Sequence, residues 1–381
     1  MKQSIIIIGG GIAGFSAAQA ARDTDPDARI YLICGEKRLP YYRNRIWETI
    51  ADGAENGINL RDPQWYADMR IDVVSAQAVS VDQEQHTLRL SDGNFLEYDK
   101  LIITTGARPV KPEAEGYDRE NVVTLRNIGD MEHLRRFPGA AVVVGSGLLA
   151  LDAAWNLTKE GRAVVIVARS KRLLPRLLEK QAGIFMLYAT ERAGIRVALR
   201  GEVASVDDEM VLLEDGRGFD ASLVVLATGV KSDIRFGKKL GTMYGRGIVV
   251  DDRMHTTMPD IWAAGDCAEH NDLICDNLKT AMEQGRTAGI CAAGGDAVYK
   301  RSREEYTLKA MGTELWVCGD TSAEDVLVYR DSRLGNFVGL CFRDEVLVGA
   351  ELIGDISNAR LLANAMDNAM SRAEAADTFL K

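Results

Sequence analysis

The feature that most limits the fold of this chain is a motif that occurs twice. IIIIGGGIAGFSAA begins at residue 5, and AVVVGSGLLALDAA repeats its pattern from residue 141. Each copy predicts a buried strand, a G-x-G-x-x-G/A turn and a helix with a small-residue face. A chain with two such βαβ units is expected to form two dinucleotide-binding folds of the α/β class.

The first copy has the spacing that a pyrophosphate site requires. Gly9 permits a tight turn, Gly11 lets phosphate groups approach the backbone, and Gly14 lets the helix pack closely on the strand. The helix begins with Ile12 and Ala13, whose backbone N–H groups lie at the positive end of the helix dipole and attract an anion. The sequence therefore predicts a dinucleotide pyrophosphate at this turn.

An acidic residue follows the second strand of this first copy. The segment RIYLICGEK ends in Glu36 and Lys37. A carboxylate at that place can accept hydrogen bonds from both hydroxyls of an adenosine ribose. We therefore expect the first copy to bind a dinucleotide whose ribose carries no phosphate at the 2′ position.

The second copy has a slightly different turn. It contains Gly145, Gly147 and Ala150, with Leu148 at the start of the helix. Alanine in the third position still permits contact between helix and strand, at a somewhat larger separation. We expect this turn also to bind a pyrophosphate.

The second strand of the second copy, in VVIVARSKRLLP, has no acid at its end. It ends in Ala168 and Arg169, and Lys171 and Arg172 follow. A ribose with a 2′-phosphate requires cations and would be repelled by a carboxylate. These residues predict a preference for NADPH. The alternative is a solvated basic loop without ribose contact, in a protein that binds NADH by other means.

Charge and cysteine pattern exclude several classes of function. The net charge of −10 disfavours nucleic acid and anionic membranes as partners. The six cysteines contain no C-x-x-C pair and show no spacing typical of a zinc site or a disulfide framework. We therefore expect reduced thiols, no metal site and a cytoplasmic location.

The remaining segments show how the chain is organised. LRL and NFLEY read as antiparallel strands joined at Asp92-Gly93, and KLIITTG returns as a buried strand. From about residue 297 the pattern changes. VLVYRD, NFVGLCF and EVLVGAELIG indicate antiparallel strands, and NARLLANAMDNAM has helical spacing.

Several motifs resemble those of one known family. TTGARP at residue 104, ATGVKSD at residue 227 and TTMPDIWAAGDCAE at residue 256 are similar to segments of the FAD-dependent pyridine nucleotide-disulfide oxidoreductases. The resemblance covers nearly the whole chain. Within that family, LPYYRNRIWETIADG and the compact C-terminal region resemble the NAD(P)H:rubredoxin oxidoreductases.

The resemblance implies a domain organisation. Two nested Rossmann-like domains are expected, an FAD-binding domain from residues 1–110 and 231–296 and an NAD(P)H-binding domain from residues 111–230. A small α+β domain from residues 297–381 would follow.

The resemblance also implies roles for single residues around the flavin. Arg43 would lie near the FAD pyrophosphate, and the backbone of Ala78 would meet the adenine. Thr105 and Gly106 would line the flavin cleft.

A late segment is expected to complete that flavin site. Asp266, with Gly265 beside it, would bind the ribityl chain or a phosphate, although a helix N-cap is an alternative role for Asp266. The helix near residues 279–285 would direct its N-terminus toward the flavin, where its dipole stabilises a reduced, anionic ring.

The chain departs from its family in two ways. Disulfide-reducing members have a cysteine pair that is absent here, so electrons are expected to leave the flavin directly. Relatives often pair a lysine with a glutamate beneath the flavin, where this chain has Glu48 and Asp152. Two adjacent acids would raise one pKa and provide a proton donor. The alternatives are that Arg45 neutralises them, or that they are separated and solvated.

These observations predict an FAD-dependent NAD(P)H oxidoreductase, a monomer or homodimer, that passes single electrons to a small acidic carrier such as rubredoxin. An NAD(P)H oxidase that reduces oxygen and a redox-responsive signalling protein are the alternatives. Cations would help an acidic carrier to dock. The candidates by charge are Arg43, Arg45, Arg235, Lys238 and Lys239.

Overall fold

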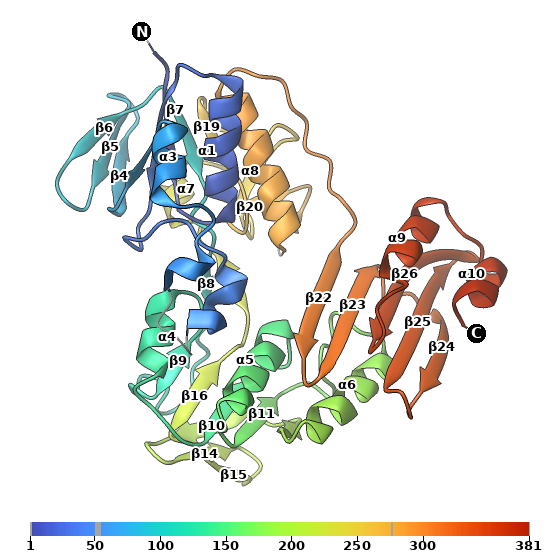
Figure 1. Cartoon of the computed structure of the whole chain (residues 1–381). Coiled ribbons are helices and arrows are strands. Elements are labelled where there is room, and N and C mark those ends of the chain that lie inside the picture. The colour runs from blue at the N-terminus through green and yellow to red at the C-terminus, as the bar shows by residue number, and fades with distance from the viewer. Residues whose placement is uncertain (1, 50–54, 276, 381) are drawn as a thin grey trace. The chain divides into compact units, whose positions relative to one another are not determined.

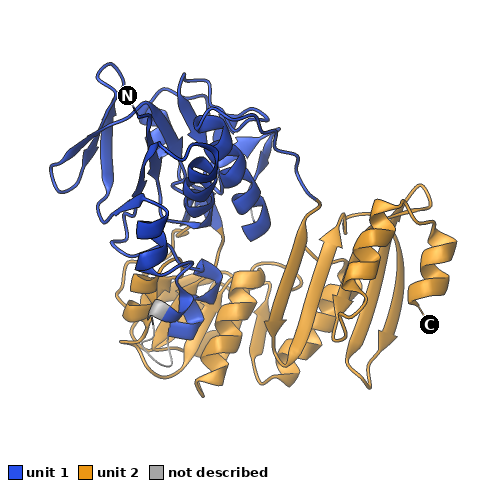
Figure 2. Ribbon diagram, turned by 45° about the horizontal axis from the view of Figure 1, so that its top comes forward, with its two compact units in different colours: residues 1–108, 230–302 blue, residues 109–229, 303–381 orange. Residues whose placement is uncertain are grey.

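The computed structural model describes residues 2–49, 55–275 and 277–380 (Figure 1). It divides into two compact units, Met1–Arg108 with Val230–Ser302 and Pro109–Gly229 with Arg303–Lys381 (Figure 2). The first unit is therefore built from two stretches of chain that more than one hundred residues separate. Residues 50–53, at the end of the motif LPYYRNRIWETIADG, lie outside the described residues.

A five-stranded parallel sheet forms the centre of the first unit. Its strand order is β19-β7-β1-β2-β3. The side chains of Ile5, Ile6 and Ile7 are fully buried, which explains the uninterrupted apolar run, since strands of such sheets are covered on both faces. The strands are β1 (Ser4–Ile8), β2 (Arg29–Ile33), β3 (Ile71–Val74), β7 (Lys100–Ile103) and β19 (Ile261–Ala263).

Two helices from distant parts of the sequence lie side by side in this unit (Figure 1), α1 (Ile12–Thr24) and α8 (Leu278–Ala292). A Cβ atom at Gly285 would lie 2.2 Å from the carbonyl oxygen of Ala13. A Cβ atom at Gly289 would lie 2.2 Å from the carbonyl oxygen of Ala17. Only glycine permits this approach, so the small residues of both helices attach the late segment to the first dinucleotide fold.

Smaller elements complete the first unit. The predicted hairpin at Asp92-Gly93 is confirmed, because Gly93 has a φ of 90° and its N–H donates to the Leu90 carbonyl at 3.1 Å. It joins two strands of a three-stranded antiparallel sheet. The remaining elements are β4 (Ala78–Asp82), β5 (Thr87–Leu90), β6 (Phe95–Glu97), η1 (Arg43–Glu48), η2 (Glu55–Ile58), α3 (Pro63–Asp68), β8 (Ala107–Pro109), β17 (Val230–Ser232), α7 (Arg235–Lys239), β18 (Ile248–Val250), β20 (Ala268–His270) and β21 (Leu273–Ile274).

The second unit contains the second copy of the dinucleotide fold. Its parallel sheet has the order β12-β11-β10-β16-β9, and a three-stranded antiparallel sheet, β13-β14-β15, accompanies it. Its elements are β9 (Val122–Thr124), α4 (Ile128–Leu134), β10 (Ala141–Val144), α5 (Leu148–Lys159), β11 (Val164–Ala168), α6 (Lys180–Arg192), β12 (Arg196–Leu199), β13 (Val203–Val206), β14 (Met210–Leu213), β15 (Gly218–Asp220) and β16 (Leu223–Leu226).

The C-terminal part of the second unit is an antiparallel sheet of order β22-β23-β26-β25-β24 with two helices. The three predicted strands and the helix are confirmed, and with them the fold class. Two strands, EYTLKA and TELWVCG, were not predicted. Of these, β22 alternates exposed with half-buried side chains and lacks an apolar run. The elements are β22 (Glu305–Ala310), β23 (Thr313–Gly319), β24 (Asp325–Asp331), β25 (Asn336–Arg343), β26 (Val346–Ile353), α9 (Ala359–Asp367) and α10 (Arg372–Phe379).

The cysteines form no disulfide, and all six are free. Burial raises the pKa of Cys34 to about 12 and that of Cys267 to about 11, so both thiols stay protonated near neutral pH. Within the described ranges, no three His, Cys, Asp or Glu side chains are grouped so that they could hold a metal. Nor does any helix of that part of the chain have the length and apolar character needed to cross a bilayer.

Candidate nucleotide-binding sites

The predicted residues of the first unit lie at one edge of its sheet. The five strands are parallel, so their carboxyl ends meet at the same edge, where α/β proteins bind ligands. Each strand is followed there by a predicted residue. Gly9 follows β1, Glu36 follows β2, Ala78 follows β3, Thr105 follows β7 and Gly265 follows β19.

Two glycines of the first fingerprint are required by the packing of the protein on itself. Gly9 has a φ of 127°, and a Cβ atom there would lie 2.2 Å from the Thr104 carbonyl oxygen. A Cβ atom at Gly14 would lie 1.9 Å from the Gly9 carbonyl oxygen, so the helix and the turn could not approach as they do.

Gly11 has no such reason inside the protein. Its φ of −81° suits any residue, and no heavy atom lies within 4 Å of the place that a Cβ would take. It precedes α1, whose N-terminus has no side-chain cap. No side chain caps the backbone N–H groups of that first turn, and the space beside Gly11 is open, which fits an anionic group from outside the chain.

Glu36 is held in place by two neighbours. The Tyr41 hydroxyl donates to one carboxylate oxygen at 2.6 Å, and Arg43 donates to the other at 2.7 Å. Burial alone would lower the pKa of Arg43, but Tyr41, Glu36 and Asp266 raise it above its ordinary value. The structure thus brings together Glu36, Arg43 and Asp266. Tyr41 was missed, although it stands in the motif PYYR.

Asp266 lies in the turn between β19 and β20. The alternative role of helix N-cap is wrong, because Asn277 caps α8 by accepting the Thr280 N–H at 2.9 Å. The Gly265 N–H donates to Oε1 of Gln284 at 2.9 Å.

Gln284 was missed by sequence reasoning. It is a fully buried polar residue on the small-residue face of α8, and its Nε2 has no hydrogen-bond partner among the described residues. A buried amide donor of this kind is costly unless something accepts from it. Its position beside Gly265 fits a bound polar group at this edge of the sheet.

Thr105, Gly106 and Ala78, the other predicted residues of this unit, lie at the same edge of the sheet. Thr105 donates through Oγ1 to the carbonyl of Asp233 at 2.8 Å, and the Asp233 N–H donates to the carbonyl of Gly106 at 2.8 Å. Ala78 opens β4 and pairs with Leu90.

The second fingerprint repeats the geometry of the first. A Cβ atom at Gly145 would lie 2.2 Å from the Ala227 carbonyl oxygen, while the corresponding place at Gly147 has no heavy atom within 4 Å. The helix α5 then begins at Leu148 without a side-chain cap. Ala150 is fully buried against the turn. This unit therefore has a second open anion cradle.

The basic loop after β11 begins at the surface. The Arg169 side chain is 73% exposed, 3.7 Å from Glu202, a carboxylate that sequence reasoning did not consider. Lys171 is also exposed. Arg172 instead donates to the carbonyl of Pro175 at 3.1 Å within the same loop. Two of the three predicted cations are thus exposed at the end of the strand, one of them beside Glu202.

Comparisons with known proteins agree with this architecture. A family model described as pyridine nucleotide-disulphide oxidoreductase matches residues 3–285. The chain belongs to the pyridine nucleotide-disulphide oxidoreductase family. A second model, described as the C-terminal domain of rubredoxin NAD+ reductase, matches residues 306–370.

Several electron-transfer proteins are related to this chain. NADH-rubredoxin oxidoreductase of Clostridium acetobutylicum is 30% identical over 96% of this chain and 95% of the relative. The ferredoxin reductase component of chlorobenzene dioxygenase from a Cupriavidus species is 32% identical over 90% of this chain and 87% of the relative. This chain covers 49% of the Bacillus subtilis assimilatory nitrate reductase electron transfer subunit, at 28% identity. It thus spans about half the length of that relative.

Solved structures share the fold of this family member along its whole length. A ferredoxin reductase from Rhodopseudomonas palustris superimposes with a TM-score of 0.93 at 25% identity, over 100% of this chain and 98% of that chain. NADH:rubredoxin oxidoreductase from Clostridium acetobutylicum superimposes with a TM-score of 0.82 at 28% identity, over 97% and 96%. The family uses FAD and NAD(P)H. The open cradles at Gly11 and Gly147 and the unpaired amide of Gln284 fit such cofactors.

The acids predicted to share a proton are found in different units. Glu48 pairs with Arg45 through contacts of 2.6 and 2.5 Å, and this hydrogen-bonded pair lowers the pKa of Glu48. Arg45, which was the alternative partner of the acids, thus neutralises Glu48. Asp152 accepts a hydrogen bond from Asn156 on α5 at 2.9 Å, and its pairing with Glu48 stays a prediction.

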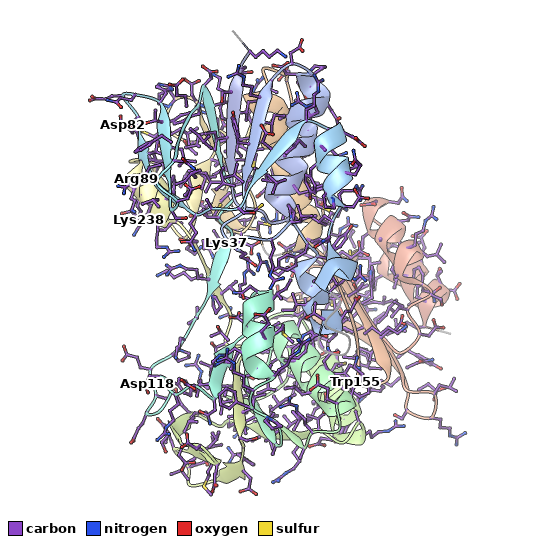
Figure 3. All side chains as sticks on the ribbon, turned by 60° about the vertical axis from the view of Figure 1, so that its left-hand side comes forward. Lys37, Asp82, Arg89, Asp118, Trp155 and Lys238 are labelled. Carbon is purple, nitrogen blue, oxygen red and sulfur yellow. The ribbon has the colours of Figure 1, made fainter. Side chains whose placement is uncertain are left out.

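The cations proposed for docking have partners of their own. Arg235 pairs with Asp233 at 2.7 Å, and Lys239 donates to the Val79 carbonyl at 3.3 Å. Lys238 lies 4.3 Å from the ring centre of Tyr244. Figure 3 shows Lys238 and, after β2, Lys37 in the first unit. A groove beside α7 is lined by acids as well as cations, so this face is of mixed charge.

We expect Gly11→Ala to weaken FAD binding without unfolding the protein. The added methyl meets no protein atom, but it would fill the space left for a phosphate, and such overpacking costs about 1–3 kcal/mol, roughly a 5- to 150-fold rise in Kd. Flavin content per chain and the thermal unfolding midpoint of the flavin-free protein measure the two effects. Gly57→Ala is the control, an exposed position of the same unit with equally open surroundings. Unchanged flavin affinity in Gly11→Ala would contradict the assignment.

We expect Glu48→Gln to leave the pH profile of flavin reduction unchanged. Because Arg45 lowers the pKa of Glu48, this carboxylate is still ionised at a pH where an ordinary glutamate becomes protonated. It therefore cannot titrate between about pH 6 and 9. Rapid-mixing measurements of flavin reduction across this range check the expectation. Loss of one limb of the profile in the variant would restore Glu48 as a proton donor.

Proposed function

We propose that this protein is an FAD-dependent NAD(P)H oxidoreductase that passes electrons to a small carrier protein such as rubredoxin. One observation carries the proposal. Two dinucleotide turns, each with a second glycine that faces open space, occur in one chain with a C-terminal domain of the rubredoxin NAD+ reductase type. The NADH-rubredoxin oxidoreductase of Clostridium acetobutylicum matches this chain along nearly its whole length.

In this proposal the two cofactors occupy the two copies of the fold. Residues 1–110 and 231–296 hold FAD, and residues 111–230 hold the pyridine nucleotide. The pyrophosphate of FAD lies at the turn of Gly11, near the charge of Arg43, and Glu36 accepts from the adenosine ribose. Asp266 and the buried amide of Gln284 provide polar contacts from the late segment.

The chemistry that FAD supplies when bound is acceptance of a hydride from the nicotinamide and release of electrons one at a time. The residues of this chain bind and orient the two nucleotides. Cys34 and Cys267 are buried and protonated, so they provide no thiol relay. The carrier therefore receives electrons without a protein disulfide. Free, buried cysteines suit a reducing compartment, and we place the reaction in the cytoplasm.

Anaerobic rapid mixing tests this function. The flavin-loaded enzyme is reduced with NADPH or NADH and then mixed with rubredoxin or a ferredoxin. We expect fast flavin reduction and faster reoxidation by a carrier than by oxygen. Equal oxygen consumption with and without a carrier would favour an NAD(P)H oxidase. Slow reduction with a long-lived charge-transfer complex would favour a redox-responsive signalling protein.

We further propose that NADPH is the preferred donor. The strand β11 ends in Ala168, which places no carboxylate against a 2′-phosphate, and the exposed Arg169 follows it. An engineered water-forming NADPH oxidase with a TM-score of 0.86 and 19% identity shares the fold. Replacements at three neighbouring positions of that oxidase introduce alanine, arginine and serine, in this order. The same three residues stand in the same order here at Ala168, Arg169 and Ser170. Several relatives are named for NADH or NAD(+), and a nitrite reductase of Bacillus subtilis is named for NAD(P)H.

We expect Arg169→Ala to reduce kcat/KM for NADPH about 10- to 150-fold and to leave that for NADH nearly unchanged, since a hydrogen bond to a charged group contributes about 1.5–3 kcal/mol. Steady-state rates of flavin-dependent carrier reduction measure both values. Arg192→Ala, which removes an exposed arginine at the end of α6, is the control. A wild-type enzyme that uses NADH more efficiently than NADPH would overturn the preference.

A further inference from the structure

The loop of residues 169–179 joins β11 to α6 and carries the cations of the proposed 2′-phosphate site. Its first part is fixed within its own domain. The Gly201 N–H donates to the Ala168 carbonyl at 3.0 Å, and the Arg200 N–H donates to the Ser170 carbonyl at 3.1 Å. These contacts attach the start of the loop to the end of β12.

The middle of the loop is attached to the second fingerprint. The Leu174 N–H donates to the carbonyl of Ser146 at 2.8 Å. Leu174 is buried and has a φ of 49°, a left-handed conformation that is costly for leucine. The loop is thus held directly against the turn that we assign to the pyrophosphate.

The far end of the loop is held by the C-terminal domain. The Thr321 hydroxyl, which follows β23, donates to the Leu177 carbonyl at 2.8 Å. Glu351 on β26 accepts from the N–H of Glu179, the N-cap of α6, at 2.6 Å. Near this contact, Phe185 of α6 packs against Phe337 of β25, with ring centroids 5.6 Å apart.

Burying the carboxyl group of Glu351 at this position costs free energy. Its side chain is fully buried, and Oε2 has no hydrogen-bond partner among the described residues. Burial and the nearby Glu179 carboxylate raise its pKa to about 8, although the Glu179 N–H and Arg172 oppose this. The Cys341 thiol of β25 lies near it, and burial together with the Glu351 carboxylate raises the pKa of that thiol. An apolar residue would pack at lower cost but could not hold the end of the loop.

We infer that Thr321 and Glu351 are positioning residues for pyridine nucleotide specificity. The end of β12 and the second fingerprint hold the start and middle of the loop, and the C-terminal domain completes this attachment by holding Leu177 and Glu179. Together these contacts keep Arg169 and Lys171 in place relative to the phosphate-binding turn. Two exposed cations discriminate a 2′-phosphate from a 2′-hydroxyl only when the loop that carries them is already ordered, because ordering it on binding would oppose the gain. The inference rests on the proposed preference for NADPH.

The test compares two probes on the flavin-loaded protein by calorimetry. Adenosine 2′,5′-bisphosphate carries the 2′-phosphate, and 5′-AMP lacks it. Thr321→Val removes the hydroxyl at nearly constant size, and we expect it to weaken the bisphosphate about three- to tenfold, as for the loss of one hydrogen bond, while 5′-AMP binding stays unchanged. Thr321→Ser, which keeps the hydroxyl, should restore the wild-type ratio of the two affinities.

A second pair of variants addresses Glu351. Glu351→Leu removes the acceptor and should reduce the same ratio, whereas Glu351→Gln retains an oxygen for the Glu179 N–H and should keep it. KM for NADPH should rise in Thr321→Val and Glu351→Leu, while KM for NADH and both kcat values stay at wild-type level. A residue with only a structural role would change the thermal midpoint and leave the ratio unaltered.

The possible failures can be told apart. If the wild-type protein prefers the bisphosphate but Thr321→Val and Glu351→Leu leave the ratio unchanged, the positioning role is wrong and the preference for NADPH stands. Equal weakening of both probes would also contradict positioning. If the wild-type protein binds both probes alike, the preference itself is wrong, and the inference fails with it.

Discussion

The contact between α1 and α8 is the constraint on which the first nucleotide site depends. Gly285 and Gly289 approach the carbonyl oxygens of Ala13 and Ala17 so closely that any larger residue would separate the helices. Because α8 is attached this tightly, residues that lie more than two hundred positions after the first fingerprint reach the same unit. Gln284 and Gly265 can then contribute to an edge of the sheet that the first hundred residues leave incomplete.

The two copies of the fold hold the charged residues after their second strands in different ways. In the first, Glu36 is fixed by Tyr41 and Arg43, so two neighbours determine the orientation of its carboxylate. In the second, the end of the strand has no acid, and the cations stand on a loop whose far end is held by another domain. The first arrangement is local, whereas the second makes the C-terminal sheet part of how the loop is positioned.

The ionisable groups near the sites also limit the chemistry. Burial keeps the thiols of Cys34 and Cys267 protonated, and Arg45 keeps Glu48 ionised. Neither kind of group is suited to exchange a proton or a disulfide near neutral pH. These three groups thus provide neither a thiol relay nor a proton donor near neutral pH, in agreement with a family member that lacks the cysteine pair of disulfide reductases.

The sequence by itself determined the α/β fold, the two fingerprints and the hairpin at Asp92-Gly93, because strand-helix periodicity and glycine spacing are local properties of the chain. It could not identify Tyr41, Gln284, Glu202 or Glu351, since nothing local distinguishes these residues from ordinary polar positions. Only the tertiary structure brought Gln284 to Gly265 and Glu351 to the start of α6. Such pairings depend on which distant segments pack together, and packing is decided by the whole chain.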